Sequence, residues 1–465
     1  MSTDLSLFSA TELVHGFARG TLSPVEAAEA ALNKIDRHND TYNAFILVDR
    51  DGALAAAKAS EKRWKDKSPL GLIDGVPTSI KDLSLTKGWP TLRGSKTTDP
   101  AGPWEEDAPY VARMREHGAV FLGKTTTPEF GWKGVTDSPL TGITRNPWDP
   151  TKTPGGSSGG AAVACATGMG ALHQGSDGGG SVRMPCGFTG IYGIKATFGR
   201  VPVYPASPFG TLSNIGPMTR TVADAALMLT VMSEPDLRDW YALPHDNTDW
   251  RQALSQSIKG YRIAFSPDLG HAKVDPDVAA LVRTAAESFE ELGAHVETHD
   301  PGIGDTSEIF RIFWYSGAAS VYRGLTAEQQ AMLDPGLREV CEVGSEITLA
   351  EFQDATKARE AFGQKLNAMF SEYDLLLTPT LPITAFEAGE EVPVGSGMKR
   401  WPEWTPFSHP FNLSRHPAAT IPCGRCPDGL PAGLQILSAH HREDKVIAAS
   451  RAYETGHPIE LPPIG

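Results

Sequence analysis

Two segments rich in serine and glycine lie in the middle of the chain, and their residue types suit acyl-transfer chemistry. The first spans residues 155–160 around Ser157, and the second spans residues 175–181 and ends on Ser181. Three glycines directly before Ser181 allow backbone N–H groups to turn toward one point. Such N–H groups form an oxyanion hole, which stabilises the negative oxygen that develops in acyl transfer. A phosphate-binding loop would instead need Lys-Ser or Lys-Thr after its last glycine, and the sequence lacks it.

A flexible linker is the alternative interpretation of residues 155–160. The small residues at 161–171 speak against it, because such a run packs tightly inside a core. A third candidate, Lys81, follows an apolar run at 76–80 that we expect to be a buried strand. Taken alone, Lys81 fits an ordinary surface lysine at a strand end. Its role therefore depends on the segments that accompany it.

Three ordered motifs resemble those of the amidase signature family. Residues 75–82 (GVPTSIKD) resemble its lysine motif, and residues 154–160 (PGGSSGG) resemble its Gly-Gly-Ser-Ser-Gly-Gly motif. Residues 177–185 (DGGGSVRMP) resemble its Asp-x-Gly-Gly-Ser-x-Arg-x-Pro motif, and the 24 positions from Ser157 to Ser181 match its spacing. Weaker similarity at 146–149, 374–382 and 417–437 extends the resemblance over most of the chain.

The resemblance implies a catalytic role for three side chains. Ser181 would be the nucleophile and Lys81 the general base, which must be neutral, so burial must lower its pKa. Ser157 would follow a cis peptide bond after Gly156, link Ser181 to Lys81 and pass a proton to the departing nitrogen. No metal or organic cofactor is implied.

The resemblance also implies binding and supporting roles. Asp177 would hold the glycine loop through backbone hydrogen bonds, Arg183 would orient a carboxylate or the loop itself, and Ser158 would support the site. Gly131 would line the substrate pocket. The backbone N–H groups expected to bind the oxyanion belong to Gly178, Gly179, Gly180 and Ser181.

Alternating apolar strands and helical runs are expected to position these residues. They predict a single large α/β domain with a mixed, mostly parallel β-sheet covered by helices on both faces, which is the amidase signature fold. An N-terminal helical segment, residues 1–65, would pack on the α/β domain of residues 66–465. The expected strands are 76–80, 119–122, 261–265, 295–298, 374–378, 418–421 and 434–437. The expected helices are 25–35, 51–64, 223–232, 276–292, 350–370 and 445–453.

Composition narrows the possible partners and location. The net charge of −14, from 42 basic and 56 acidic residues, argues against nonspecific nucleic-acid binding. We expect no membrane segment, since no apolar run approaches about 20 residues, and no secretory signal. Five sparse cysteines suggest reduced thiols in a cytoplasm, and the single pair Cys423 and Cys426 lacks the partners of a zinc site. A homodimer is the default expectation.

The expected activity is hydrolysis of a carboxylic amide to an acid plus ammonia or an amine. Segments 86–104, 203–212, 310–322 and 389–404 are expected to form the acyl pocket, and their aromatic residues favour an aryl or arylacetamide substrate. These residues are Trp89, Trp104, Phe209, Phe313, Trp314, Tyr315, Trp401 and Trp404.

Three alternatives remain at this stage. An α/β-hydrolase would use Ser158 as nucleophile with a later acid and His409, His416, His440 or His441. The glutamine-hydrolysing subunit of a tRNA-dependent amidotransferase would need a partner and a downstream tyrosine-rich stretch, which residues 338–357 lack. A non-catalytic binding protein would have no need of Lys81, Ser157 and Ser181 together.

Overall fold

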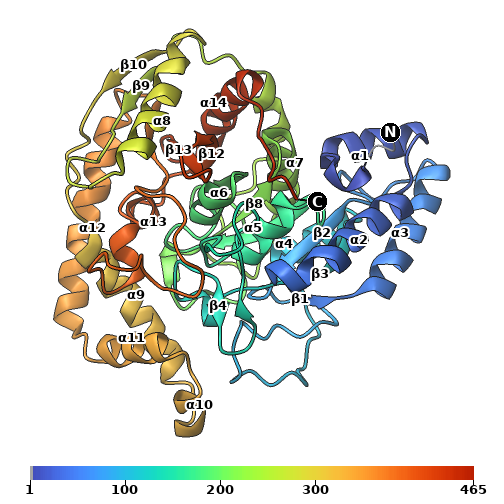
Figure 1. Cartoon of the computed structure of the whole chain (residues 1–465), viewed down its shortest axis with the longest axis horizontal. Coiled ribbons are helices and arrows are strands. Elements are labelled where there is room, and N and C mark those ends of the chain that lie inside the picture. The colour runs from blue at the N-terminus through green and yellow to red at the C-terminus, as the bar shows by residue number, and fades with distance from the viewer. Residues whose placement is uncertain (1–3, 465) are drawn as a thin grey trace.

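An eleven-stranded sheet runs through the computed structural model, which describes residues 4–464 (Figure 1). From one edge to the other, its strands are β1 (Phe45–Val48), β3 (Val120–Thr125), β2 (Pro77–Lys81), β6 (Leu172–Asp177), β8 (Asn214–Thr219), β7 (Tyr192–Lys195), β12 (Ala418–Arg425), β13 (Pro431–Leu437), β11 (Leu375–Pro379), β9 (Arg262–Phe265) and β10 (His295–Thr298). A separate short pair joins β4 (Asp137–Ser138) to β5 (Gly142–Ile143).

The sheet is mixed, as predicted, but parallel pairing is confined to two blocks. The first block is β3-β2-β6 and the second is β11-β9-β10. The other neighbouring pairs of the described sheet are antiparallel. The prediction gave parallel pairing too large a share, because β12 and β13 form a hairpin and β7 returns to β8 through a loop, without the crossover helix that a parallel pair requires.

Helices cover both faces of the sheet. They are α1 (Ala10–Arg19), α2 (Pro24–Tyr42), α3 (Arg50–Lys65), α4 (Pro109–Glu116), α5 (Gly159–Ala166), α6 (Arg183–Thr189), α7 (Val222–Met232), α8 (Pro276–Glu287), α9 (Ser307–Tyr322), α10 (Ala327–Ala331), α11 (Pro335–Ser345), α12 (Leu349–Met369), α13 (Pro410–Leu413) and α14 (Glu443–Gly456). Figure 1 places α1 to α3 at one side of the molecule and α9, α11 and α12 at the other.

Alternating side chains of the strands show how the two faces are used. Ile263 and Phe265 of β9 belong to the hydrophobic cluster that contains residues of α7, α8 and α14. Ala264, between them, belongs to the cluster that contains residues of α9, α11 and α12. Successive side chains of a strand point to opposite faces, so a strand buried on both faces is apolar throughout.

The helix predicted at 25–35 is present as α2, which begins at Pro24 after a capping serine, Ser23. Ser23 Oγ accepts a hydrogen bond from the Val25 N–H at 3.0 Å, and Glu26 accepts one from the Ser23 N–H at 3.2 Å. Pro24 occupies the first helical position, where its missing N–H has no partner to lose. Helix α2 then continues to Tyr42, beyond the predicted end at residue 35.

Two other predictions need correction. The first 65 residues are not wholly helical, because strand β1 lies between α2 and α3 and pairs with β3. The predicted helix 276–292 ends as α8 at Glu287 and is followed by a short 3-10 turn. The division of the chain at residue 65 stays a prediction. No described helix is long and apolar enough to cross a membrane.

Candidate active site

The order of the strands brings the lysine motif and the second glycine loop together. Strands β2 and β6 are parallel neighbours, with Thr78 opposite Leu172 and Ser79 opposite His173. Their carboxyl ends therefore meet at one edge of the sheet, the usual place for a ligand site in an open α/β sheet. Lys81 is the last residue of β2, and the loop that ends on Ser181 directly follows β6.

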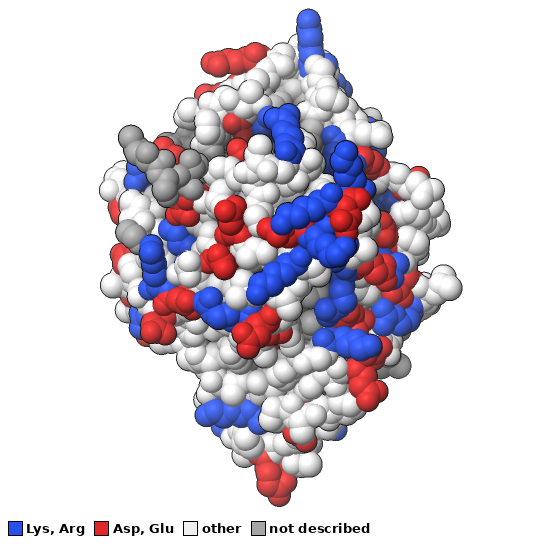
Figure 2. Space-filling view, turned by 90° about the vertical axis from the view of Figure 1, so that its right-hand side faces the viewer, with Lys and Arg blue, Asp and Glu red and all other residues white. Residues whose placement is uncertain are grey.

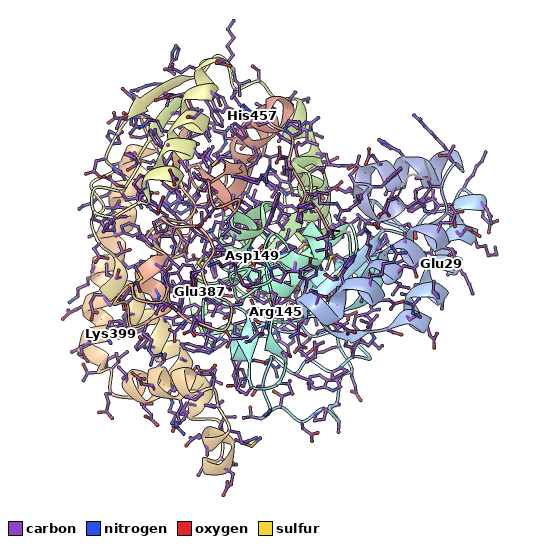
Figure 3. The ribbon with its side chains drawn as sticks, in the orientation of Figure 1. Glu29, Arg145, Asp149, Glu387, Lys399 and His457 are labelled. Atoms are coloured by element: carbon purple, nitrogen blue, oxygen red, sulfur yellow. The ribbon has the colours of Figure 1, made fainter. Side chains whose placement is uncertain are left out.

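The loop that carries Ser157 comes to the same edge just before α5. The segment that leads into this loop is held by contacts with residues of the C-terminal part of the chain. Thr153 N–H donates to Phe386 O at 2.7 Å, and Lys152 Nζ lies 2.9 Å from Glu387 Oε1. Figure 3 labels Glu387 and Asp149, which lie near one another in the middle of the view. The expected cis peptide bond between Gly156 and Ser157 is present.

Lys81 is fully buried and surrounded by three serine hydroxyls. Its Nζ lies 2.8 Å from Ser157 Oγ, 2.8 Å from Ser158 Oγ and 2.9 Å from Ser176 Oγ. Burial lowers the pKa of Lys81 well below its ordinary value, and the negative charge of Asp177 only partly opposes this. The neutral amine is therefore favoured, as a general base requires.

We expect kcat/KM to rise with pH through the lowered pKa of Lys81. Protonated Lys81 has no lone pair to accept the proton, so the rate grows as the lysine loses its charge. Because burial lowers this pKa, the rise comes at a lower pH than an exposed lysine would give. The measurement is kcat/KM from pH 5 to about pH 10 on a neutral amide. Rates that are highest in acid and fall through neutrality would contradict the role of Lys81.

Ser157 and Ser181 lie on the wall of the same cavity. Ser157 is 2% exposed and Ser181 is 4% exposed, so both side chains are almost fully buried at the cavity wall. The described residues include no hydrogen bond to Ser181 Oγ, which leaves this hydroxyl available to a substrate. Ser157 Oγ, by contrast, is held by Lys81 Nζ.

Asp177 organises the glycine loop, as predicted. It accepts hydrogen bonds from the N–H groups of Gly180 at 2.9 Å and Val182 at 3.2 Å. The prediction that Gly180 is an oxyanion donor needs correction, because its N–H already donates to Asp177. The candidate N–H groups that donate to no acceptor among the described residues are those of Gly178, Gly179 and Ser181.

Arg183 orients the loop through a buried ion pair with Asp177. Its Nη2 lies 2.9 Å from Asp177 Oδ1, and both side chains are fully buried. Arg183 also donates to Gln435 Oε1 and Asn412 Oδ1, each at 2.7 Å, and to Ser408 O at 3.0 Å. Burial alone would raise the pKa of Asp177, but Arg183, together with the charge of Lys195 and a hydrogen bond from Asn412, outweighs burial, and the pKa falls to about 2.

We expect Asp177→Asn to lower the free energy of unfolding by about 3–5 kcal/mol, because it leaves a buried guanidinium without its counter-charge. The stabilisation by Asp177 is present above an ordinary carboxyl pKa of about 4 and is lost as pH falls toward its folded value of about 2. Urea unfolding at neutral pH measures the change. The control is Glu308→Gln, since the Glu308–Arg311 pair is exposed and should contribute less than about 1 kcal/mol. Equal effects of the two substitutions would contradict the prediction.

The cavity beside Ser181 encloses about 1300 Å³, including the part open to solvent. Gly131 lines it, as predicted, and a Cβ added there would lie 3.3 Å from Ser157 Oγ. Phe209 and Trp314 also line it and stack with their ring centroids 3.8 Å apart.

Of the eight aromatic residues expected near the acyl group, only Phe209 and Trp314 are among the described residues that line this cavity. Trp401 and Trp404 are buried in the core behind it. The predicted segments missed Tyr110 and Phe130, which do line it.

Ser158 has a supporting position rather than that of a nucleophile. Its Oγ accepts from Lys81 Nζ and donates to Ser176 O at 3.1 Å, and it is fully buried. The four histidines of the α/β-hydrolase alternative are absent from the described cavity wall. Within residues 4–464, no group of three or more His, Cys, Asp or Glu side chains could hold a metal ion.

The sequence interpretation missed two polar residues of this site. Ser176 Oγ contacts Lys81. Ser176 lies in the same serine-glycine segment as Ser181, directly before Asp177, and this position could have indicated a role in the site. Asn412 Nδ2 donates to Asp177 Oδ1 at 2.8 Å and to Asp177 O at 2.9 Å. Asn412 lies 235 positions from Asp177 along the chain, so no local pattern of residues indicated the contact.

Comparisons with known proteins point to one family. A model of the Amidase family matches residues 26–447. An acylamidase of Rhodococcus erythropolis is 37% identical over 467 residues, which cover 98% of this chain and 96% of the relative. A glutamyl-tRNA(Gln) amidotransferase subunit of Myxococcus xanthus is 35% identical and covers 98% of each chain.

Solved structures agree with these relatives. A bacterial aryl acylamidase described as an amidase signature enzyme has a TM-score of 0.90 at 31% identity, covering 98% of this chain and 97% of its own. A 6-aminohexanoate cyclic dimer hydrolase complexed with substrate has a TM-score of 0.89 at 27% identity, covering 99% of each chain.

Proposed function

Because the chain belongs to the amidase signature family, whose enzymes hydrolyse amide C–N bonds, we propose that its substrate is a carboxylic amide with an aryl or arylacetyl group. Cleavage would proceed through an acyl-enzyme on Ser181. The observation that carries this proposal is the 2.8 Å contact between Lys81 Nζ and Ser157 Oγ beside a cavity that both Ser157 and Ser181 line.

In the proposed first half-reaction, Ser181 Oγ attacks the amide carbonyl carbon. Its proton passes to Ser157, whose own proton passes to the neutral amine of Lys81. The carbonyl oxygen becomes an oxyanion and accepts hydrogen bonds from the free N–H groups of the glycine loop. When the C–N bond breaks, Ser157 gives a proton to the departing nitrogen and recovers one from Lys81.

In the second half-reaction, water attacks the acyl-enzyme. The same relay carries a proton from water to Lys81 and returns one to Ser181 as the carboxylic acid leaves. The ring pair Phe209 and Trp314 supports an aromatic acyl group, since stacked or edge-on rings gain about 0.5–1.5 kcal/mol beyond their buried area. The relative named acylamidase and the aryl acylamidase structure also support this substrate class.

A second candidate is the glutamine-hydrolysing subunit of an amidotransferase, which the relative at 35% identity favours. The cavity disfavours it. Glutamine carries an α-ammonium group, and the described cavity wall contains no Asp or Glu to pair with that charge. A stand-alone amidase is therefore the first choice. A homodimer and a cytoplasmic location stay predictions.

The test is release of amine or ammonia by the purified chain. The panel contains arylacetamides, anilides, aliphatic amides and glutamine, each with Ser181→Ala as control. Turnover of an arylacyl amide that disappears in Ser181→Ala supports the proposal. Turnover of glutamine alone, and only once a candidate partner protein is added, would instead favour the second candidate.

A further inference from the structure

Arg93 is the only residue with a formally charged side chain on the described wall of the active-site cavity. The other lining residues are apolar, aromatic, glycine or hydroxyl-bearing. A single cation in such surroundings strongly influences which ligand can bind, because charges interact more strongly when less water surrounds them.

The guanidinium of Arg93 has no acidic partner among the described residues. None of their carboxylates lies within 4.0 Å of it in an ion pair, and its side chain makes no described hydrogen bond. Arg63 and Arg400, which are also partly buried, pair with Asp74 and Glu391. Acidic residues outnumber basic ones, 56 to 42, so a shortage of carboxylates does not explain the free guanidinium.

Asp82 is the acidic residue whose charge acts on Arg93, but its carboxylate is engaged elsewhere. It accepts from the N–H of Leu92 at 3.1 Å and of Gly94 at 3.2 Å, and it lies 4.0 Å from Lys124 Nζ. Burial lowers the pKa of Arg93, and Asp82 partly opposes this. The guanidinium therefore remains incompletely compensated.

The backbone of Arg93 is held firmly beside the proposed catalytic serines. Its φ of 58° is uncommon for a residue other than glycine. Arg93 N–H donates to Asp82 O at 3.0 Å, and Phe130 N–H donates to Arg93 O at 2.7 Å. Gly131, the next residue, lies against Ser157. The cation and the proposed reacting groups thus belong to one fixed wall.

On these observations we propose that Arg93 binds a carboxylate of the substrate. The substrate class would then be an amide that carries a carboxylate in addition to the scissile bond, which deepens the proposed function and rests on it. A guanidinium presents a planar fork of N–H donors that matches a carboxylate. One positive charge also balances one carboxylate, whereas a phosphate would bring about two negative charges.

Two matched substrate pairs test the proposal. In the first pair the carboxylate is on the acyl part: the mono-anilide of glutaric acid against pentananilide. In the second it is on the amine part: para-acetamidobenzoate against para-methylacetanilide. The readout is the ratio of kcat/KM for the charged member to that for the uncharged member. It is measured in the natural chain, in Arg93→Met and Arg93→Lys, and in Arg19→Met, an exposed arginine outside the cavity wall.

We expect Arg93→Met to lower this ratio by about 10- to 100-fold in one of the pairs, as loss of a hydrogen bond between charged groups does. Arg93→Lys should retain part of the ratio, and Arg19→Met should retain all of it. The pair that responds identifies the half of the substrate that carries the carboxylate. A ratio unchanged by Arg93→Met in both pairs overturns the proposal.

Binding separates this proposal from the proposed function. Calorimetry on the Ser181→Ala protein measures the Kd of each compound without turnover, and the double variant with Arg93→Met measures what Arg93 contributes. Carboxylates that bind at least about 10-fold more weakly to the double variant support the carboxylate site even if no amide is hydrolysed. Hydrolysis that requires Ser181, together with Kd values unaffected by Arg93→Met, overturns the carboxylate site alone.

Discussion

Ser181→Ala should lower kcat by about 10,000-fold or more, because it removes the oxygen proposed to attack the carbonyl carbon. Ser181 Oγ faces the cavity without a described hydrogen-bond partner, whereas Ser158 is fully buried behind Lys81. The measurement is steady-state turnover of the best amide of the panel. A mass spectrum of the natural chain with a slow substrate should also show an acyl group on Ser181.

The control for loss of a buried serine is Ser79→Ala. Ser79 lies on β2 close to Lys81 and is fully buried, but its Oγ bonds His173 at 2.8 Å and is not on the cavity wall. The Ser79→Ala variant should be less stable than the natural chain but keep most of its turnover. Activity within about 10-fold of the natural chain in Ser181→Ala, or an acyl group on a different residue, would contradict the assignment of the nucleophile.

Lys81→Met is expected to lower kcat/KM by about 1,000-fold or more, since it removes the only amine in contact with Ser157 among the described residues. Methionine preserves much of the length and packing of the side chain while abolishing proton transfer. The rise of kcat/KM with pH should disappear together with the rate. Kinetics over the same pH range as for the natural chain provide both measurements.

Lys124→Met is a matched control, because Lys124 is equally buried and lies on the adjacent strand opposite Ile80. Burial lowers its pKa to about 8, and its Nζ donates to Ser84 O and Thr91 Oγ1 and not to the hydroxyls that contact Lys81. We expect this variant to be destabilised but active. Similar kinetic losses in both lysine variants would show that burial, rather than base catalysis, explains the effect.

The double variant of Lys81→Met and Ser181→Ala tests whether the two residues act together. The effects of substitutions within one proton relay are not additive, so the double variant should be hardly slower than Ser181→Ala alone. Losses that multiply would indicate two independent contributions and would contradict a shared proton relay.

The face of the molecule shown in Figure 2 carries charges of both signs. In the view of Figure 2, basic and acidic side chains lie interspersed and no broad area of one sign appears. Inside the cavity, by contrast, Arg93 is the one charged residue of the described wall.

The order of residues alone predicted the family, the α/β fold class and the segments that carry Lys81, Ser157 and Ser181. Local chemistry explains why. A capping serine before Pro24, apolar runs that form strands, and glycines before a serine each act within a few residues, so their effect can be read from the printed order. The cis peptide bond after Gly156 was also predicted, from the resemblance of its motif.

The hydrogen-bond and ion-pair partners of these residues became known from the folded structure. The fold brings Ser176 into contact with Lys81, 95 positions away along the chain. It also brings Gln435 into contact with Arg183, 252 positions away. It engaged the N–H of Gly180 and made the centre of the sheet antiparallel. It also left Arg93 without an acidic partner among the described residues. Hydrogen bonds and ion pairs depend on distance in space rather than on distance along the chain. The order and direction of the strands set that distance, and no local pattern of residues contains it.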